Sequence, residues 1–480
     1  MSEDPTPART AVVLGGSHTG MLAARALSGL ADRVVVVERD VLPDGPAPRK
    51  GLPQARHAHM LWSGGVRAVT ELLPGVADAL RDVGARRLPV TTDMVVMGSR
   101  GWFRRWPESH HVILAGRDLL DATIRAQVLA DERVELLDGV EVLGLEGNAG
   151  AVTGVRVRSS RRHTTDAPGS GVGDDGVRVV EAGLVVDATG RGSGASRWLT
   201  ELGLPAVERR EVDSGLAYAS RLYLAPEQAR SGYPIVNVQP DPRDGRPGRA
   251  GFLLPIEDGR WIVTLNGSRG GEPSAAEDDF VRFAREELRH PIIGELLERA
   301  EPLSDVAYTR TTLNRRHFYE RMPAWPENFT VLGDALAAFN PLYGHGLAVA
   351  AQSALSLRDV VRRHGWGVPG LSRRLQKAVA RPVGAAWDLA VGQDVFYPGA
   401  TENGPTLRDR LVSAYVGRLM LTATGNGRIA RRVTDVTSLE RGAEVLLTPS
   451  VLLAAAAGPL KPPLTAPPLT VEELKRAGLQ

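Results

Sequence analysis

Residues 331–350, VLGDALAAFNPLYGHGLAVA, could present bare backbone N–H groups to a ligand. A short strand at 330–332 runs into Gly333 and Asp334, and a helix of small apolar residues follows. Three residues open that helix: Pro341, Gly344 and Gly346. The first turn of a helix carries N–H groups without intrahelical partners and the positive end of the helix dipole. This order of residues therefore favours a site for an anion or a polarised carbonyl group.

A second candidate is the glycine-rich turn GGSHTG, in which Gly15, Ser17 and Gly20 follow the spacing of a dinucleotide-binding turn. Serine replaces the middle glycine, but it is small enough to let a pyrophosphate approach the backbone. The spacing alone is weak evidence, because ordinary strand-to-helix turns share it. Its surroundings strengthen it: a strand precedes the turn, a helix follows, and the next strand ends on Glu38. An acid at that place can hold a ribose hydroxyl.

Residues 41–65 form a proline-rich loop without periodicity that carries several basic groups. These groups are Arg49, Lys50, Arg56, His57 and His59. The loop could lie over a cofactor, or it could be a solvated basic connector, and position alone leaves both open. Arg117 stands between a strand and an amphipathic helix, where an arginine either faces a phosphate or ring edge or is simply solvated.

The elements that must position these residues alternate between strand and helix in the N-terminal part. The periodicity predicts strands at 11–14 and 34–37, helices at 21–30, 66–73 and 77–83, a strand pair at 91–96 and 102–106, and a β meander from 134 to 186. The meander is interrupted at 159–176 by a low-complexity insert, which we interpret as a hairpin tip without chemistry.

A third glycine turn, containing Gly190, Gly192 and Gly194, follows the strand that ends the meander. No strand ending in an acid follows it about twenty residues on, so we reject an independent nicotinamide-binding fold there.

The middle of the chain, residues 205–320, has longer strands and few helices, which predicts an antiparallel sheet. Inserted between two halves of a cofactor domain, such a sheet makes a natural wall for a second pocket. Four aromatic residues could line it, or each could be a core residue at an alternating position: Tyr218, Tyr223, Phe252 and Trp261. Helices at 371–391 and 407–422 and a proline-rich tail complete the chain.

The composition bounds the function. The 480 residues provide ample chain for a large core and a cleft between lobes. The net charge of +2 disfavours nucleic acid as a partner, and the absence of cysteine excludes disulfides, thiolate metal sites and a cysteine nucleophile. The start of the chain is polar and the apolar runs are too short to span a bilayer, so we expect a cytoplasmic protein that is not held in a membrane.

Together, the Gly15 turn with Glu38, the DATGR segment at 187–191 and the motif from Gly333 to Gly346 resemble FAD-dependent monooxygenases of the aromatic-hydroxylase fold. This resemblance covers nearly the whole chain. It implies an α/β fold class with an α+β insert: a Rossmann-like FAD-binding domain at 1–90, 107–204 and 321–370, an inserted antiparallel-sheet substrate domain at 91–106 and 205–320, and a C-terminal helical region at 371–480. Within the group, the stretches 49–65, 255–264 and 338–347 are most similar to the polyene epoxidases of polyether-ionophore antibiotic biosynthesis, the lasalocid and monensin type.

The resemblance also implies roles for single residues. Gly15, Ser17 and Gly20 would approach the FAD pyrophosphate, Glu38 would hold the adenosine ribose, and Asp334 would accept a hydrogen bond from the ribityl chain or support the pyrophosphate through water. Further expected cofactor contacts are Arg39 beside the adenine, Arg49, Arg117 at the ribityl and pyrophosphate region, Gly333, and the flavin-ring loop with Pro341, Gly344, His345 and Gly346. No side chain is assigned a certain catalytic role, and His345 is either catalytic or packed beside the loop. No metal is expected.

The implied activity is that of an oxidoreductase that uses FAD, O2 and electrons from NAD(P)H. A flavin C4a-hydroperoxide would epoxidise an alkene of a hydrophobic polyene, either free or bound to a carrier protein, in a dry cavity. Thr189 stands where single-component hydroxylases carry the aspartate of an Asp-Gly pair, so a separate flavin reductase could supply the electrons. The rival hypotheses are an aromatic polyketide hydroxylase of the same fold and a non-catalytic binding protein on that fold. A flavin halogenase is disfavoured because no Trp-x-Trp-x-Ile-Pro segment is present.

Overall fold

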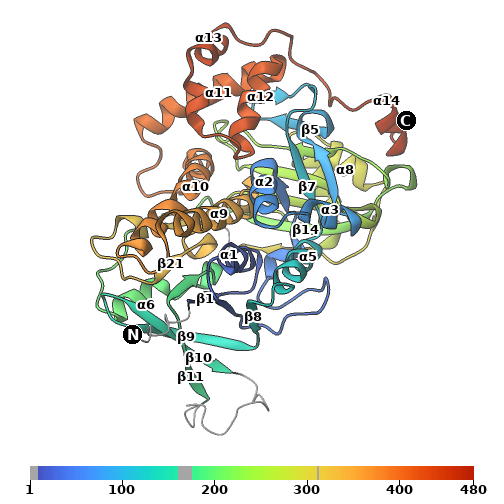
Figure 1. Ribbon diagram of the computed structural model, residues 1–480. Coiled ribbons are helices and arrows are strands. Elements are labelled where there is room, and N and C mark those ends of the chain that lie inside the picture. The colour runs from blue at the N-terminus through green and yellow to red at the C-terminus, as the bar shows by residue number, and fades with distance from the viewer. Residues whose placement is uncertain (1–8, 160–175, 311–312) are drawn as a thin grey trace, which may run out of the picture.

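A five-stranded parallel sheet forms the base of the molecule in a computed structural model that describes residues 9–159, 176–310 and 313–480 (Figure 1). Its strand order is β21-β12-β1-β2-β8, and every neighbouring pair is parallel. The strands are β1 Thr10–Leu14, β2 Arg33–Val37, β8 Val134–Leu137, β12 Leu184–Asp187 and β21 Phe329–Val331. Most of these strands read as continuous apolar runs, as expected for a parallel sheet buried on both faces.

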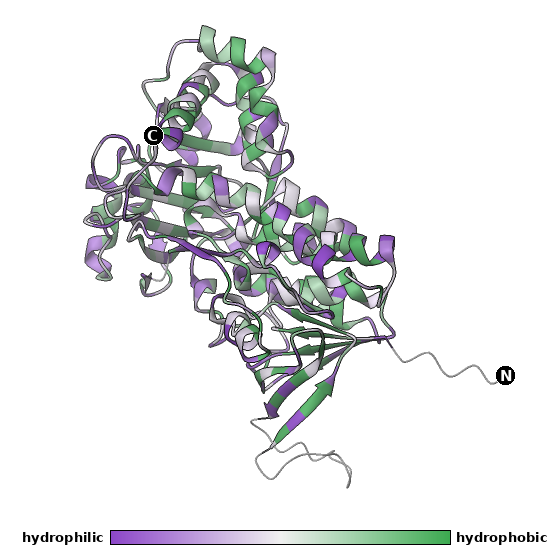
Figure 2. Cartoon of the chain, turned by 90° about the vertical axis from the view of Figure 1, so that its left-hand side faces the viewer, coloured by the Kyte–Doolittle hydropathy of each residue, from purple (hydrophilic) through white to green (hydrophobic). Residues whose placement is uncertain are grey.

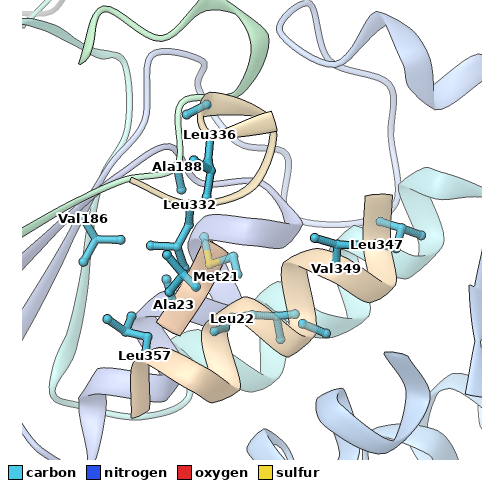
Figure 3. Close-up of a cluster of buried hydrophobic side chains, with 14 of the residues drawn as sticks. Met21, Leu22, Ala23, Val186, Ala188, Leu332, Leu336, Leu347, Val349 and Leu357 are labelled. Atoms are coloured by element: carbon cyan, nitrogen blue, oxygen red, sulfur yellow. The ribbon is translucent and has the colours of Figure 1, made fainter. Parts of the chain in front are cut away.

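Helices from both ends of the chain cover this sheet. Figure 3 shows buried side chains of α1, α9 and the neighbouring strands packed into one cluster, with Met21, Leu332 and Leu357 among them. The helices that surround the sheet and the adjoining sheets are α1 His18–Ser28, α2 Ser63–Leu72, α3 Val76–Asp82, α5 Arg117–Leu129, α6 Ala195–Glu201, α9 Gly346–His364 and α10 Leu371–Asp394. This one core therefore contains both β1 and β21, the first and the last strand in chain order of the parallel sheet, as expected for an FAD-binding fold.

A second, eight-stranded sheet is mostly antiparallel and has the order β18-β14-β17-β16-β15-β5-β6, with β19 also paired to β14. Its strands are β5 Met94–Gly98, β6 Gly101–Trp102, β14 Ala217–Leu224, β15 Ile235–Val238, β16 Arg249–Pro255, β17 Arg260–Gly267, β18 Glu301–Pro302 and β19 Ala307–Thr309. The expected strand pair at 91–96 and 102–106 is wrong in detail, because a short helix, α4 Val90–Asp93, precedes β5 and β6 has only two residues.

The two faces of this sheet meet different parts of the molecule. Alternate residues point to opposite faces of a strand. One face, represented by Ile235, Leu254 and Ile262, belongs to the same core as the parallel sheet. The other, represented by Leu253 and Val263, packs in a second core with helices α7 Glu277–Glu286 and α8 Ile292–Leu297. Figure 2 shows hydrophobic residues along the strands of both sheets.

Three smaller sheets complete the strands. They are β3 Met60–Trp62, β7 His111–Leu114 and β4 Arg86–Pro89; β9 Val140–Gly147, β10 Val152–Ser159 and β11 Val177–Glu181; and β13 Arg209–Val212, β20 Asn314–His317 and β22 Ala337–Ala338. The β9–β11 sheet projects at the end of the molecule opposite the C-terminal helices (Figure 1). The expected hairpin tip falls on 160–175 and the polar start of the chain on 1–8, which lie outside the described residues.

The C-terminal part is helical, as the sequence predicts. It comprises α11 Leu407–Gly425, α12 Gly427–Thr437, α13 Pro449–Ala457 and α14 Val471–Arg476, and a small core of its own contains Leu419, Ile429 and Val451. Among the described residues, no helix combines the length and the apolar character needed to cross a membrane. The α/β fold class with an inserted antiparallel sheet is confirmed.

Candidate functional site

A large cleft opens at one edge of the parallel sheet. The register aligns Leu14 with Val37 and Asp187, and Asp187 with Val331, so the turns after β1, β2, β12 and β21 leave the sheet side by side. This is where ligands bind in open α/β sheets. The cleft has a volume of about 1480 Å³ and is lined by these turns, by the loop at 48–60 and by residues 339–347.

The glycine turn after β1 is built for close backbone approach. Gly15 has a left-handed φ of +99°, and a Cβ there would lie 2.6 Å from the Ala188 carbonyl oxygen. A Cβ on Gly20 would lie 1.7 Å from the Gly15 carbonyl oxygen. Gly15 and Ser17 line the cleft, whereas Gly20 does not. The expectation that Gly20 itself approaches a ligand is therefore corrected: its role is to let α1 pack against the turn.

Glu38 holds the end of β2 against this turn. Its Oε2 accepts a hydrogen bond from the Gly16 N–H at 2.6 Å, and its Oε1 accepts one from the Asp40 N–H at 2.9 Å. Glu38 and its exposed neighbour Arg39 both line the cleft. The carboxylate is thus fixed by the backbone, with acceptor capacity left for the hydroxyls of a ligand.

Two arginines and a second acid complete what we call the charged part of the cleft: Glu38, Arg49, Arg117 and Asp121. The Arg49 side chain is only 7% exposed and lies between the two acids, 3.5 Å from Glu38 Oε2 and 3.7 Å from Asp121 Oδ2. Arg117 Nε donates to Asp121 Oδ1 at 2.8 Å. Both arginines line the cleft. Arg49 is therefore not a solvated connector residue, and the interpretation of its loop as a cover over the cleft is the one that the structure favours.

Arg191 links the remaining turns. Its guanidinium donates to the carbonyl oxygens of Phe339 at 2.6 Å and Leu313 at 3.2 Å, and its Nε lies 3.8 Å from Asp334 Oδ2. Asp334 lines the cleft with 41% of its side chain exposed. The DATGR segment had been recognised as a motif, but this role of its arginine had not.

Gly333 was expected to contact a cofactor and does not line the cleft. Its φ is +59°, and a Cβ there would lie 2.7 Å from the Thr19 side chain. Its contribution is to bring the turn after β21 against α1, which leaves Asp334 as the member of the pair that faces the cleft.

The opposite wall contains the loop at 341–346 and the first turn of α9. Pro341, Gly344, His345 and Gly346 all line the cleft. A Cβ on Gly346, Gly190 or Gly192 would meet no other atom within 4 Å. These glycines therefore leave space and bare backbone at two places in the cleft, the start of α9 and the turn after β12, which is what a bulky ligand with hydrogen-bond acceptors requires.

Four histidines, of which His18, His57 and His345 are buried and His59 is partly buried, line the cleft and are neutral at physiological pH. Burial lowers the pKa of His18, His57 and His345 to about 4 and that of His59 to about 3, with nearby arginines adding to the shifts of His18, His57 and His59. His345 is 5% exposed and pairs through Nε2 with the Thr437 carbonyl oxygen at 2.9 Å. It is packed beside the loop, and its Nδ1 has no partner among the described residues.

A neutral part of the cleft lies beside that loop. His57, Tyr218 and Asn340 line the cleft there, and we include Ser220 and Thr264, which do not line it but are hydrogen-bonded behind His57. Tyr218 OH donates to Asn340 Oδ1 at 2.5 Å, and its ring centroid is 6.0 Å from that of His57. His57 Nδ1 pairs with Ser220 Oγ at 2.8 Å, and Ser220 Oγ with Thr264 Oγ1 at 2.6 Å. His57 and Tyr218 line the cleft. Ser220 and Thr264 escaped notice in the sequence because they look like ordinary strand residues.

Three of the four aromatic residues expected in a substrate pocket do not line this cleft. Tyr223 and Trp261 face the second core, where Tyr223 lies beside Phe280 at 6.1 Å between ring centroids and Trp261 lies 5.1 Å from Tyr233. Phe252 is 7% exposed and pairs across the sheet with Thr264, so it shares the face of Thr264 but stays behind the cleft wall. The prediction is thus corrected for these three residues, and Tyr218 alone stays a candidate.

Within the described ranges, no group of three or more His, Cys, Asp or Glu residues is arranged to hold a metal ion. The cleft offers hydrogen-bond donors, a few fixed charges and open backbone instead.

Comparisons with known proteins identify the fold but no family. No protein-family model matches the chain. Protein Rv3254 of Mycobacterium tuberculosis is 29% identical over 415 residues, which are 83% of this chain and 83% of that protein, and its name states no activity.

Solved structures with the same fold include several flavoproteins. A triple variant of the flavin-dependent brominase Bmp2 has a TM-score of 0.64 and 16% identity, with 93% of this chain and 97% of that one covered. The p-nitrophenol 4-monooxygenase PnpA from Pseudomonas putida DLL-E4 has a TM-score of 0.60 and 17% identity, with 91% and 99% covered. The Diels-Alderase PyrE3 has a TM-score of 0.56 and 17% identity, with 89% and 80% covered. The chain therefore has the fold of FAD-dependent monooxygenases, a fold that also serves other reactions.

Proposed function

We propose that the chain is an FAD-dependent monooxygenase whose cofactor occupies this cleft. The observation that carries the proposal is the continuity of the cleft from the Gly15 turn and Glu38 to the loop at 341–346, along the carboxyl edge of a parallel sheet. Its volume of about 1480 Å³ exceeds the ~300–1,000 Å³ of an ordinary small-molecule pocket, which leaves room for a dinucleotide and a second ligand.

The residues present fit FAD. In the charged part, Glu38 would hold the ribose hydroxyls, and Arg117, whose Nε alone is taken by Asp121, would turn its remaining N–H groups to the pyrophosphate. The N-terminus of α1 would face the same group. The loop at 341–346 and the N-terminus of the 19-residue α9 would face the electron-rich edge of the flavin ring, where a helix terminus favours negative charge by about 0.3–1 kcal/mol.

Bound FAD would supply the activation of O2, and the chain would supply orientation and exclusion of water. Met60, Phe339 and Leu347 bring apolar surface to the wall beside the loop. The neutral histidines add hydrogen-bonding capacity without a buried charge.

For the substrate, we propose an alkene of a hydrophobic polyene, which would be epoxidised. The similarity of the stretches at 49–65, 255–264 and 338–347 to polyene epoxidases supports this choice. Oxygen transfer to an alkene needs no ionised side chain, and the neutral part of the cleft contains none.

A second candidate is hydroxylation of an aromatic polyketide with a phenolic oxygen. His57 favours it, because a neutral imidazole at the cleft wall with its Nδ1 held by Ser220 can accept a hydrogen bond from such an oxygen and orient the ring, although its lowered pKa of about 4 makes it a weak base. If this is the reaction, His57→Gln should reduce product formation at least tenfold, whereas epoxidation should be nearly unaffected.

The proposal is tested by reconstituting the purified protein with FAD and supplying 18O2, NADPH and a flavin reductase. Candidate linear polyenes and fused aromatic compounds are then compared by mass analysis. One labelled oxygen atom in the polyene product supports epoxidation, and label in the aromatic product alone shifts the choice to hydroxylation. A protein that cannot bind FAD would contradict the proposal and revive a non-catalytic binding role.

The electron source is tested separately. Thr189 Oγ1 donates to Asp187 Oδ1 at 2.6 Å, so its side chain is already engaged within its own turn. We propose that a separate flavin reductase delivers the electrons. Rapid bleaching of the flavin when NADPH alone is added anaerobically would contradict this.

A further inference from the structure

A buried carboxylate outside the parallel sheet accepts hydrogen bonds from four side chains of three separate segments. Asp394, the last residue of α10, has no exposed surface. Its Oδ2 accepts from Asn314 Nδ2 at 2.6 Å, and Oδ1 accepts from Tyr343 OH at 2.7 Å. Two further donors reach Oδ2: Asn340 Nδ2 at 2.8 Å and Ser214 Oγ at 3.4 Å.

Two of these donors flank the loop beside the cleft. Asn340 precedes the turn Pro341–Tyr343, and its Oδ1 also accepts from the Leu342 N–H at 3.0 Å. Tyr343 ends the turn, and Gly344 follows in the left-handed region at φ +65°. One carboxylate therefore holds both ends of the turn that leads into α9.

The same cluster reaches the wall of the cleft. Tyr218 OH donates to Asn340 Oδ1, and the Asn340 N–H donates to Asn314 Oδ1 at 2.7 Å. Tyr218 lies on β14 of the large sheet and Asn314 on β20, so Asp394 connects the C-terminal helix, the inserted sheet and the loop.

The donor set indicates that Asp394 is a carboxylate. All four neighbours named above donate to it, and such bonds favour the ionised form, although burial raises the pKa of this group. A buried negative charge thus stands directly behind the loop.

We propose that Asp394 is a positioning residue for FAD: it fixes the loop at 340–344 in the conformation that receives the flavin ring and places a negative charge behind it. The inference rests on the proposed FAD site. Neither the glycine turn after β1 nor the sequence motif of the loop predicts a role for Asp394.

The test compares Asp394→Asn with Asp388→Asn, the same change at an exposed position on the same helix. The dissociation constant of FAD and the reduction potential of the bound flavin are measured for both. Asp394→Asn should weaken FAD binding about tenfold or more, because a buried bond to a charged acceptor is lost. It should also raise the reduction potential, because reduction adds negative charge and the variant removes one. Asp388→Asn should match the unaltered protein.

If Asp394→Asn does not fold, the test uses Tyr343→Phe, which removes only one of the donors to Asp394. This variant should weaken FAD binding about threefold, and in the double variant the two effects should amount to less than their sum, because both alter the bond between Tyr343 and residue 394. The inference would be overturned if Asp394→Asn left both FAD binding and the reduction potential unchanged, or if Tyr343→Phe left FAD binding unchanged. Either result would leave the proposed function standing. Failure of the unaltered protein to bind FAD would overturn the proposed function instead.

Discussion

The charged and neutral parts of the cleft are built in different ways. In the charged part, Glu38 follows directly on β2, Arg117 begins α5 and is separated from the end of β7 by two residues, and Arg49 lies between the two acids. In the neutral part, His57 meets Ser220, and Tyr218 meets Asn340, across separations of 163 and 122 residues.

This difference indicates that the charged part holds the cofactor and that the neutral part shapes the substrate site. The charged part consists of backbone groups in fixed positions and a few charged side chains, as expected for a site that binds a polar dinucleotide. The neutral part has uncharged polar groups, of which Tyr218, Ser220 and Thr264 are on the large sheet and His57 and Asn340 on neighbouring loops. Substitutions in the charged part should therefore change FAD binding, whereas substitutions of the neutral residues on the large sheet, Tyr218, Ser220 and Thr264, should change it little.

The largest effect is expected for Gly20→Ala. The added Cβ would collide with the Gly15 carbonyl oxygen, so α1 and the turn must separate. We expect loss of retained FAD and a loss of about 3 kcal/mol in the free energy of unfolding, measured by absorbance and denaturant titration. Gly29→Ala at the end of the same helix is the control, because a Cβ there meets nothing within 4 Å. Full FAD occupancy in Gly20→Ala would contradict the assignment of the turn.

Arg117→Ala should weaken FAD binding by about a hundredfold, because a buried arginine facing the pyrophosphate is lost and Asp121 loses its partner. Fluorescence titration with FAD measures this. Arg33→Ala, an exposed arginine paired with Glu135, should bind FAD normally. Equal affinities in the two variants would remove Arg117 from the site.

His57 should make the protein less stable in acid. The unfolded histidine takes up a proton near pH 6.5, whereas the folded one does so only near pH 4. The unfolded chain therefore binds more protons in this window, and stability falls as the pH drops from about 6.5 towards 4. Between pH 7.5 and 5 the unaltered protein should lose about 2 kcal/mol more than His57→Gln. Identical losses in denaturant titrations would show that His57 is not buried as described.

The smallest effect is expected for Tyr223→Phe, which should bind FAD and turn over substrate like the unaltered protein, because Tyr223 faces the second core. Tyr218→Phe loses the bond to Asn340 and should lower turnover severalfold with FAD affinity nearly unchanged. Steady-state assays on both variants check this pair. Reduced turnover in Tyr223→Phe alone would reverse the assignment of the two sheet faces.

The fold and the charged part could be predicted because their signals are local. The spacing from Gly15 to Glu38 lies within one strand–helix–strand unit, and β-branched runs mark the parallel strands. The resemblance then extended these signals to Asp334 and the loop at 341–346.

The neutral part could be predicted only in fragments. Tyr218 and Tyr223 are five positions apart on one strand, so their side chains must point to opposite faces, and this parity alone excluded a shared pocket. Ser220, Thr264 and Asp394 act through contacts with segments far away in the sequence, which no spacing rule reveals. Gly20 and Gly333 were assigned to the ligand because a motif does not distinguish a glycine that faces a ligand from one that allows packing.

The most direct test is a titration of the apoprotein with FAD and, separately, with FMN, which lacks the adenosine that the charged part is proposed to hold. The account predicts that FAD binds at least about a hundredfold more tightly, since Glu38 would contact only the larger cofactor and Arg117 would face one phosphate of FMN instead of the two of FAD. Equal affinity for the two flavins, or binding of neither, would contradict it.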